Sequence, residues 1–378
     1  MRYYIIVGEA SGDLHGSNLM KGILAKDPQA EFRFWGGDLM SSISGVQVRH
    51  YKGTSVMGIV EVVSKLGKIF KNMKFCKEDI LKYSPDVVIL IDYPGFNLKI
   101  AKFAKENGLK VFYYIAPKVW ASREGRIAKL KKYVDKLFII FPFEIEYFKR
   151  KGLDAIYCGN PLIDSVDNDP AMSESREEFL RRNGISGDLE TIALLAGSRR
   201  MEIDQLMPVY AELAKRYKGK YQFLLAAAPS IPLSYYDKYI DGVDIKPIQS
   251  DTYAIVRHSK AAVVASGTAS LEAALIGTPQ VVCYRVNVFT AMLAKMLLKI
   301  KYVSLGNLII DSMAFKELLQ KDCTVEKISA ELGLLTKDEV YIEKMKGEYA
   351  KIREMLGGSG ASEKIAETML ETIRNSYK

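Results

Sequence analysis

The sequence has 378 residues, of which 48% are hydrophobic and 26% charged, with 54 Lys and Arg against 45 Asp and Glu. This composition is that of an ordinary globular protein, and at roughly 150 residues per domain the length predicts about two domains. It excludes intrinsically disordered, collagen-like and disulfide-scaffold proteins. The net charge of +9 lies entirely in residues 1–165, which hold 26 basic and 17 acidic residues, whereas residues 166–378 hold 28 of each.

Short β-branched and aromatic runs that end in Gly, Asp or Pro alternate with longer stretches of helical periodicity. Several are apolar at every position, which is typical of parallel strands covered by helices on both faces. The order of strand, loop and helix predicts a doubly wound α/β architecture. The predicted strands are Tyr3–Val7, Asp86–Ile91, Lys110–Tyr114, Lys136–Phe141, Thr191–Leu195, Gln222–Ala226, Ala261–Val264 and Gln280–Tyr284. A polar stretch, Asp164–Ser175, separates them four and four and is interpreted as a linker between two Rossmann-like halves that face each other across a cleft.

The loop after the first predicted strand reads GEASGDLHG, residues 8–16, and leads into a helical stretch. Small residues before a helix let the backbone approach a phosphate or sugar. The loop is not GxGxxG, and the carboxylates of Glu9 and Asp13 would repel a pyrophosphate. The loop is therefore interpreted either as a sugar-binding loop or as a tight strand-to-helix turn.

Asp92 follows the fully apolar run Val87–Ile91 and precedes a Pro-Gly turn. Ligands of such sheets bind at the carboxyl ends of the strands, where a partly desolvated carboxylate has a raised pKa suited to a general base. The alternative is that Asp92 only caps the next helix.

Two loops of the second half have the features of a nucleotide site. Gly197-Ser198-Arg199-Arg200 places guanidinium groups at a strand end, where arginine holds diphosphates by paired hydrogen bonds. Ser266-Gly267-Thr268 opens a helix, and Glu272 lies one turn further on the same face, placed to reach ribose hydroxyls. The alternative is a helix cap with a solvated glutamate. No P-loop motif is present.

The lengths of the apolar stretches and the cysteine pattern indicate the cellular location. The first apolar run is too short for a signal-peptide core, and Val288–Ile300 is interrupted by lysines and shorter than the roughly 20 residues of a membrane-spanning helix. The scattered cysteines, Cys76, Cys158, Cys283 and Cys323, form no CxxC pair and favour a reducing compartment. We therefore expect a cytoplasmic protein.

Two lysine-rich amphipathic stretches could nevertheless contact a membrane surface. In Lys65–Lys82 the lysines surround an apolar stripe, and helical geometry places Phe75 opposite Leu66, which leaves an aromatic ring among lysines. This pattern is typical of an interfacial basic helix, although a helix packed on the core with solvated lysines fits it equally. Val288–Lys301 is similar and could instead be a domain or dimer contact.

Eight segments, in order along nearly the whole chain, resemble the lipid-A-disaccharide synthases, family 19 of the glycosyltransferases. They are GEASGDLHG (8–16), VMGIVEVV (56–63), IDYPGFN (91–97), PKVWA (117–121), FPFE (141–144), GSRRMEI (197–203), SGTASLEAALIGTP (266–279) and YVSLGNLI (302–309).

The resemblance implies a GT-B fold with three parts. Residues 1–165 would form an acceptor-side, membrane-facing domain and residues 166–345 a UDP-binding domain. Residues 346–378 would form helices that pack back on the first domain or on a partner subunit, which leaves a homodimer open.

The implied reaction transfers 2,3-diacylglucosamine from UDP to the 6-hydroxyl of 2,3-diacylglucosamine 1-phosphate. It inverts the anomeric carbon and gives the β-1′,6-linked lipid A disaccharide 1-phosphate, a precursor of lipopolysaccharide in Gram-negative bacteria, and UDP. No metal or cofactor is required in the family. The implied location is peripheral, on the cytoplasmic face of the inner membrane, at an anionic surface.

Matching the family motifs residue by residue implies the site. Asp92 would deprotonate the acceptor, Arg199 would stabilise the departing UDP, and Glu9 completes the catalytic group. The UDP-binding residues would be Gly197, Ser198, Arg199, Ser266, Gly267, Thr268, Glu272 and Asn307, and the acceptor-side residues Ser11, Gly12, Asp13 and Asn97. No metal ligand is implied.

The chain departs from the family pattern at Gly95, where a second aspartate is usual, so that Asp92 would have to act alone. Further departures are Asn160, Ala196, Gly306 and Ser122, and none removes a proposed catalytic group. The rival functions are another GT-B enzyme (a lipid-linked N-acetylglucosaminyltransferase or a UDP-sugar 2-epimerase) and a non-catalytic UDP-sugar-binding protein. A nucleic-acid binder fits the basic charge, but no RRM, KH or zinc signature accompanies it.

Overall fold

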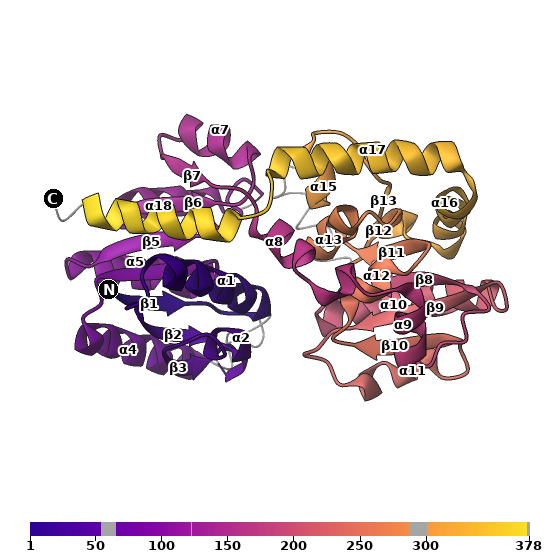
Figure 1. Ribbon diagram of the computed structural model, residues 1–378, viewed down its shortest axis with the longest axis horizontal. Helices are drawn as coiled ribbons and strands as arrows, with labels where there is room; N and C mark the ends of the chain where they lie inside the picture. The colour runs from indigo at the N-terminus through magenta and orange to yellow at the C-terminus, as the bar shows by residue number, and fades with distance from the viewer. Residues whose placement is uncertain (54–65, 122, 287–300, 376–378) are drawn as a thin grey trace. The chain divides into compact units, whose positions relative to one another are not determined.

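The computed structural model describes residues 1–53, 66–121, 123–286 and 301–375. Two of the segments discussed above, residues 56–63 and 288–300, therefore lie outside the described residues. The chain folds into two compact units, one formed by Met1–Asp164 together with Gly357–Lys378 and the other by Ser165–Leu356 (Figure 1). Each unit is a parallel sheet covered by helices, which confirms the predicted α/β class.

The first unit contains a seven-stranded sheet in the order β3-β2-β1-β4-β5-β6-β7, with all neighbours parallel. Its strands are β1 (Arg2–Ile6), β2 (Glu31–Gly36), β3 (Val46–His50), β4 (Val87–Ile91), β5 (Lys110–Tyr114), β6 (Lys136–Ile139) and β7 (Ala155–Tyr157). Its helices are α1 (Ala10–Lys26), α2 (Asp38–Ser41), α4 (Leu66–Tyr83), α5 (Pro94–Glu106), α6 (Ile127–Tyr133), α7 (Phe143–Arg150) and α18 (Ala361–Asn375), and α8 (Pro161–Asp167) joins the two units.

Side chains alternate between the two faces of this sheet, as the two-residue period of a strand requires. Tyr3 and Ile5 of β1 pack with α1 and α18, whereas Tyr4 and Ile6 of the same strand pack with α4 and α5. Both faces are buried along β1, β4, β5 and β6, so these strands are apolar at nearly every position.

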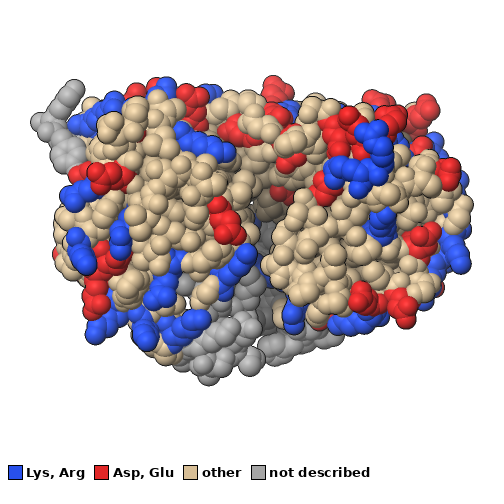
Figure 2. All heavy atoms as spheres, turned by 60° about the horizontal axis from the view of Figure 1, so that its bottom comes forward, with Lys and Arg blue, Asp and Glu red and all other residues tan. Residues whose placement is uncertain are grey.

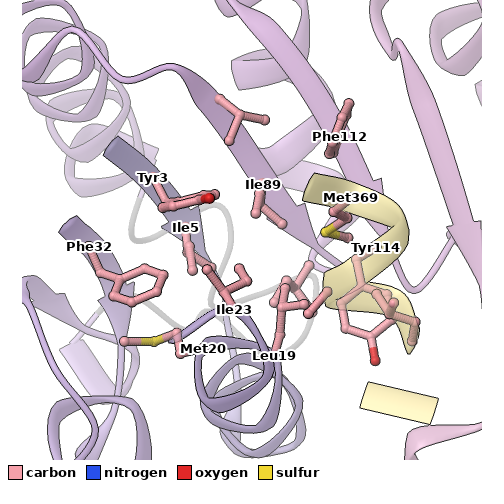
Figure 3. Packing of buried hydrophobic residues seen from close by; sticks show 14 of the residues in the cluster. Tyr3, Ile5, Leu19, Met20, Ile23, Phe32, Ile89, Phe112, Tyr114 and Met369 are labelled. Carbon is pink, nitrogen blue, oxygen red and sulfur yellow. The ribbon is translucent and has the colours of Figure 1, made fainter. Parts of the chain in front are cut away.

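The C-terminal helix α18 belongs to the core of the first unit. Figure 3 shows Met369 of α18 beside Tyr114 of β5 and Leu19 of α1. A Cβ added at Gly22 of α1 would lie 3.0 Å from the Cβ of Ala366, so the glycine allows the two helices to approach closely. Several large apolar side chains of α18 are buried, each contributing about 1.5–3 kcal/mol. The helix is thus a structural part of a unit whose other residues are more than 190 positions away in the sequence.

The second unit contains a six-stranded parallel sheet in the order β10-β9-β8-β11-β12-β13. Its strands are β8 (Glu190–Leu195), β9 (Tyr221–Ala227), β10 (Ile245–Gln249), β11 (Ala261–Ala265), β12 (Gln280–Tyr284) and β13 (Glu317–Leu319). Its helices are α9 (Arg176–Arg182), α10 (Arg200–Arg216), α11 (Asp237–Ile240), α12 (Thr252–Arg257), α13 (Thr268–Ile276), α15 (Leu305–Ile309), α16 (Val325–Lys337) and α17 (Glu339–Leu356).

All eight predicted strands are present, with bounds that differ by at most two residues. Five others, β2, β3, β7, β10 and β13, were not predicted. Each is very short, lies at or near a sheet edge, or carries polar residues or a proline, as β10 does with Pro247. Such strands lack the continuous apolar pattern of a strand buried on both faces.

The predicted linker Asp164–Ser175 is partly helical, because α8 continues to Asp167 and a 3₁₀ turn covers Pro170–Met172. The carboxylate of Asp164 accepts hydrogen bonds from the backbone N–H groups of Gly360 (2.5 Å) and Ser362 (2.9 Å), which tie this segment to the start of α18. The crossing to the first unit starts after Leu356, so that α17 belongs to the second unit and α18 to the first.

Each sheet has one point at which its connections turn in opposite directions along the sheet. This point lies between β1 and β4 in the first unit and between β8 and β11 in the second. Loops diverge there, and open α/β sheets bind ligands in the resulting crevice at the carboxyl ends of the strands. The loops singled out from the sequence follow these four strands.

Candidate active site

The backbone at Asp92 is held in an unusual conformation. Asp92 and Tyr93 have φ angles of 44° and 49°, in the left-handed region that non-glycine residues rarely adopt. The Asp92 N–H donates to the carbonyl of Tyr114 (3.0 Å), and the Asp92 carbonyl accepts from Asn97 Nδ2 (2.8 Å) and the Tyr113 hydroxyl (2.6 Å). Strain held in place by several hydrogen bonds is a recurrent property of functional loops.

The Asp92 carboxyl group has a raised pKa of about 6, chiefly because burial disfavours its charged form and secondarily because Glu9 carries a nearby negative charge. Lys118 and Arg126 oppose the shift. A carboxylate with a pKa near neutrality can accept a proton from a hydroxyl and release it afterwards. Asp92 therefore has the environment of a general base.

The loop after β1 contacts the loop after β4. A Cβ added at Gly8 would lie 2.3 Å from Cγ of Tyr93, so only glycine lets the aromatic ring lie over the backbone at this point. Glu9 precedes the first turn of α1 and accepts a hydrogen bond from the Ser11 hydroxyl (3.1 Å). The two loops bring Glu9, Ser11 and Asp92 to one end of the sheet, as predicted.

Three of the predicted acceptor-side residues have structural contacts instead. Asp13 is buried, and its carboxylate accepts hydrogen bonds from the backbone N–H groups at the start of α2, at Gly37 (2.7 Å), Leu39 (3.1 Å) and Met40 (3.2 Å). Gly12 packs against Val7, and the buried amide of Asn97 donates to carbonyls at the ends of β1 and β4. These residues fix the shape of the site.

In the second unit, the loop after β8 already holds a carboxylate. The N–H groups of Ser198 and Arg199 donate to Oε2 of Glu202 (3.1 and 3.3 Å), and Arg199 Nη1 lies 3.6 Å from Oε1 of the same side chain. Gly197 has a φ of 94°, and a Cβ there would lie 2.3 Å from Glu202 Oε2. The start of α10 is thus capped by Glu202 of the same helix, while the Arg199 side chain is 54% exposed.

The loop after β11 opens α13 as predicted, with the extended backbone of Gly267 before the first helical residue, Thr268. Thr268 is exposed. Ser266 donates to the carbonyl of Val303 (3.3 Å), and Glu272 accepts from the Tyr253 hydroxyl (3.0 Å). Burial raises the pKa of Glu272. The helix start and the acidic side chain are therefore one turn apart, as the sequence indicated.

Asn307 was assigned to UDP binding by the resemblance, but the structure buries it completely. Its amide nitrogen donates to Phe315 O (3.0 Å) and Glu317 Oε1 (2.9 Å), and its oxygen accepts from the N–H groups of Ala314 (2.8 Å) and Phe315 (3.3 Å). All four of its hydrogen-bonding positions are engaged. Its contacts are those of a residue that fixes a loop rather than one that touches a ligand.

Several groups that follow β5 and β6 were given no site role from the sequence, although Lys118 and Glu144 lie in the family segments PKVWA (117–121) and FPFE (141–144). Lys118 and Arg126 act electrostatically on Asp92, and neither was singled out. Glu144 is buried and accepts hydrogen bonds from Trp120 Nε1 (2.9 Å) and the Phe141 N–H (3.1 Å), and burial raises its pKa to about 7. The available signal was their position just after buried strands, the same signal that identified Asp92.

The lysine-rich helix α4 differs from its prediction in one respect. Phe75 was expected among the lysines, but it packs toward Trp35 (6.4 Å between ring centroids), and the guanidinium of Arg49 lies 4.8 Å from its ring centroid. Phe70 is the exposed aromatic instead, at 65%. The neighbouring strands β2 and β3 supply partners that a helical wheel does not show.

The described residues contain no group of three or more His, Cys, Asp or Glu side chains that could hold a metal ion. Within the same residues, no helix is long and apolar enough to cross a membrane.

The two parallel sheets, each with its loops at the point where the connections diverge, define the GT-B class of fold. Solved structures share it. A UDP-GlcNAc 2-epimerase from Neisseria meningitidis bound to UDP-GlcNAc is 14% identical, with a TM-score of 0.70 over 98% of this chain and 100% of that one. A glycosyltransferase from Rickettsia africae is 13% identical, with a TM-score of 0.56 over 100% of this chain and 98% of that one. These likenesses show the fold alone.

The sequence comparisons identify the family. Residues 3–369 match the family model for lipid-A-disaccharide synthetase. The lipid-A-disaccharide synthase of Geobacter metallireducens is 38% identical over 377 residues, covering 98% of this chain and 97% of the relative, and that of Myxococcus xanthus is 37% identical with the same coverage. The chain belongs to the lipid-A-disaccharide synthetase family and is a glycosyltransferase.

Proposed function

We propose that the protein transfers 2,3-diacylglucosamine from UDP to the 6-hydroxyl of 2,3-diacylglucosamine 1-phosphate, giving a β-1′,6-linked disaccharide 1-phosphate and UDP. Family membership supports this reaction. The observation within the molecule that supports it best is Asp92, a carboxylate with a pKa of about 6 at the diverging loops of the first sheet.

In the proposed mechanism, Asp92 accepts the proton of the acceptor hydroxyl as the hydroxyl oxygen attacks the anomeric carbon of the donor. The bond from that carbon to the UDP oxygen breaks on the opposite face, so the configuration inverts and no covalent enzyme intermediate forms. Glu9 contributes by keeping the pKa of Asp92 high, because its negative charge disfavours a second charge nearby. Asn97 and Tyr113 act as positioning residues through the Asp92 carbonyl.

The second unit is proposed to bind UDP and stabilise it as it leaves. The exposed guanidinium of Arg199 and the N–H groups at the start of α13 would meet the negative charge that develops on the diphosphate. Because the Ser198 and Arg199 N–H groups are bonded to Glu202, the diphosphate would either lie beside this carboxylate or displace it. Arg199 is thus the diphosphate ligand of this loop, with Thr268 and Glu272 beside the nucleoside.

The experiment that tests this function is incubation of the purified chain with UDP-2,3-diacylglucosamine and 2,3-diacylglucosamine 1-phosphate. Mass spectrometry should detect the disaccharide and UDP in equal amounts. Release of UDP and a free sugar without disaccharide would indicate a different enzyme, and binding of the donor without any turnover would indicate a binding protein.

We further propose that the first unit contacts the cytoplasmic face of the inner membrane through α4. Phe70 is exposed there, with Lys68, Lys71 and Lys74 also exposed on the same helix. Figure 2 shows Lys and Arg side chains gathered on the part of the first unit where α4 lies. An aromatic side chain among lysines inserts at the headgroup level while the lysines meet anionic lipid, each adding about 1 kcal/mol of attraction.

Sedimentation with vesicles tests this contact. Binding should require anionic lipid, weaken with salt, and fall when Lys68, Lys71 and Lys74 become Glu or when Phe70 becomes Ser. Substitution of Lys344, Lys346 and Lys351, which lie on α17 of the other unit, is the matched control and should leave binding unchanged. Undiminished sedimentation of the α4 variants would remove this helix from the membrane contact.

A further inference from the structure

Two basic side chains from one loop act on Asp92. Lys118 and Arg126 lie between the end of β5 and the start of α6, and both lower the pKa of the Asp92 carboxyl group. Lys118 is exposed, whereas Arg126 is partly buried, and burial together with the nearby charge of Arg123 lowers the pKa of its guanidinium. Within the described ranges, neither Lys118 nor Arg126 has a carboxylate within 4 Å to form an ion pair.

The backbone geometry places this pair at the same end of the sheet as the base. Strands β4 and β5 are adjacent and parallel, with Ile91 opposite Tyr114, and the Asp92 N–H bonds to the Tyr114 carbonyl at 3.0 Å. The Tyr113 hydroxyl donates to the Asp92 carbonyl at 2.6 Å, and Arg126 interacts electrostatically with the same tyrosine. The loop that carries the two cations therefore begins beside Asp92.

A partly desolvated guanidinium without a carboxylate partner costs stability, because burial of a charge is unfavourable unless the charge is paired. By contrast, Arg33, another partly buried guanidinium of this unit, is paired: it donates two hydrogen bonds to Asp79 at 2.8 and 2.6 Å. A cation that feels the charge of the proposed base but forms no direct ion pair with it is able to receive its partner from a ligand.

The acceptor of the proposed reaction carries an anionic group, its phosphate, that can pair with Lys118 and Arg126. Its reacting hydroxyl is on C6 and its phosphate on C1, and the carbons C5 and C1 are both bonded to the ring oxygen. The ring carbons that carry the hydroxymethyl group and the phosphate are therefore separated only by the ring oxygen, and a sugar that places O6 at Asp92 also brings its phosphate into this region. Arginine binds phosphate in a bidentate manner and lysine binds it as a point charge.

We propose that Lys118 and Arg126 form the subsite for the phosphate of the acceptor, an assignment that rests on the proposed function. The subsite has a second consequence for the base. A phosphate monoester carries about −1.5 to −2 charges near neutral pH, which would raise the pKa of a neighbouring carboxyl group. The two cations neutralise this charge and keep Asp92 ionised while the acceptor is bound.

The test compares two acceptors, 2,3-diacylglucosamine 1-phosphate and the same sugar with a methyl group in place of the phosphate. The wild type should prefer the phosphorylated acceptor at least tenfold in kcat/KM. In Arg126→Gln and Lys118→Gln, kcat/KM for the phosphorylated acceptor should fall about 10- to 100-fold while that for the methyl glycoside changes less than about threefold. Arg126→Lys, which keeps the charge without the planar fork, should recover part of the loss.

Lys129→Gln is the matched control, because it removes one positive charge from an exposed position of α6 just beyond the same loop. Its preference for the phosphorylated acceptor should equal that of the wild type. The KM for the UDP-sugar should be unchanged in all variants. Thermal unfolding of each variant establishes that the fold is retained.

Equal losses on both acceptors would overturn the proposal, since they would show that the pair acts only through the pKa of Asp92. A wild type that does not distinguish the two acceptors would overturn it as well. Calorimetric binding of 2,3-diacylglucosamine 1-phosphate separates this inference from the proposed reaction. If the wild type makes no disaccharide, the proposed function fails. The subsite is then supported if Arg126→Gln weakens binding and is overturned if it does not.

Discussion

Replacement of Asp92 by Asn should abolish most of the activity while stabilising the protein. Asn has nearly the same shape and, like Asp, tolerates the left-handed conformation (φ 44°) of this position. The substitution therefore changes the charge and basicity of the group without forcing the backbone to move. Asn cannot accept a proton from the acceptor hydroxyl, and loss of a general base costs about 10²- to 10⁴-fold in rate.

The expected gain in stability follows from the pKa of Asp92. Its rise from 3.8 to about 6 means that the folded state disfavours the charged form. At about 1.4 kcal/mol per pKa unit, the ionised group costs up to about 3 kcal/mol above pH 6. This cost begins to decline as the pH falls through 6, where the folded carboxyl group is protonated, and it is gone near pH 3.8, where the unfolded one is protonated as well. The variant should thus melt about 2–6 °C above the wild type at pH 7.5, and the difference should shrink below pH 6.

The assays are single-substrate kinetics and calorimetric melting from pH 4.5 to 8. In the wild type, kcat/KM should be constant above about pH 6 and fall tenfold per pH unit below it, since only the ionised carboxylate is a base. Asp154→Asn, at an exposed carboxylate of the same unit, should change neither property. An Asp92→Asn enzyme with more than a tenth of the wild-type rate, or with a lower melting temperature, would refute this account of the base.

Further substitutions test the supporting geometry. Gly8→Ala places a Cβ 2.3 Å from the Tyr93 ring. The free energy of unfolding, measured by urea titration, should fall by about 1–3 kcal/mol, and turnover should fall with it. Gly95→Ala, with no atom within 4 Å of the added Cβ, should leave the free energy of unfolding unchanged or raise it slightly. Asn307→Ala removes one of the hydrogen bonds of Glu317 and leaves the buried N–H groups of Ala314 and Phe315 without this acceptor. Unfolding should become easier by about 2–4 kcal/mol, and an unchanged midpoint in urea would contradict its structural role. In a Trp35→Phe variant, Trp120 is the only remaining tryptophan of the sequence. Its fluorescence emission should change with a midpoint near pH 7, because its hydrogen-bond partner Glu144 has a pKa of about 7. This change should vanish when Glu144→Gln is added, and its persistence there would assign it to another group.

The fold was largely predictable because its central strands are buried on both faces. Runs such as Val87–Ile91 have no polar residue, and a run of this length and composition is typical of a central strand in a parallel sheet. The edge strands were not predictable. Val46–His50 of β3 has no fully buried residue, so its sequence lacks the pattern. The place of α18 in the first unit was expected from the resemblance alone, because no local pattern specifies which sheet a distant helix covers.

The candidate site residues that directly follow a strand were predictable from the sequence. Asp92, Arg199 and Thr268 follow strands at the points where the connections diverge, and the sheet order places them there. The roles of Asp13 and Asn307 were not predictable, because a buried polar residue that holds a loop has the same sequence signature as one that binds a ligand. Only their hydrogen-bond partners distinguish the two.

Lys118 and Arg126 were not predicted as site residues for the same reason, because only their neighbours in the fold distinguish them. Both are ordinary basic residues in a chain with many, and their importance depends on the carboxylate beside them. Side-chain packing also reversed the roles expected for the two phenylalanines of α4, Phe70 and Phe75. Phe75 is covered because Trp35 and Arg49 come from neighbouring strands, and a helical wheel includes neither.

The anomeric configuration of the disaccharide, read from the proton coupling constant by NMR, tests whether Asp92 is the base of a single displacement. If Asp92 acts as a base in a single displacement, the α-linked donor must give a β-linked product. An α-linked product would require either two displacements through a covalent intermediate or same-face attack on an ion pair, and would contradict the role assigned to Asp92.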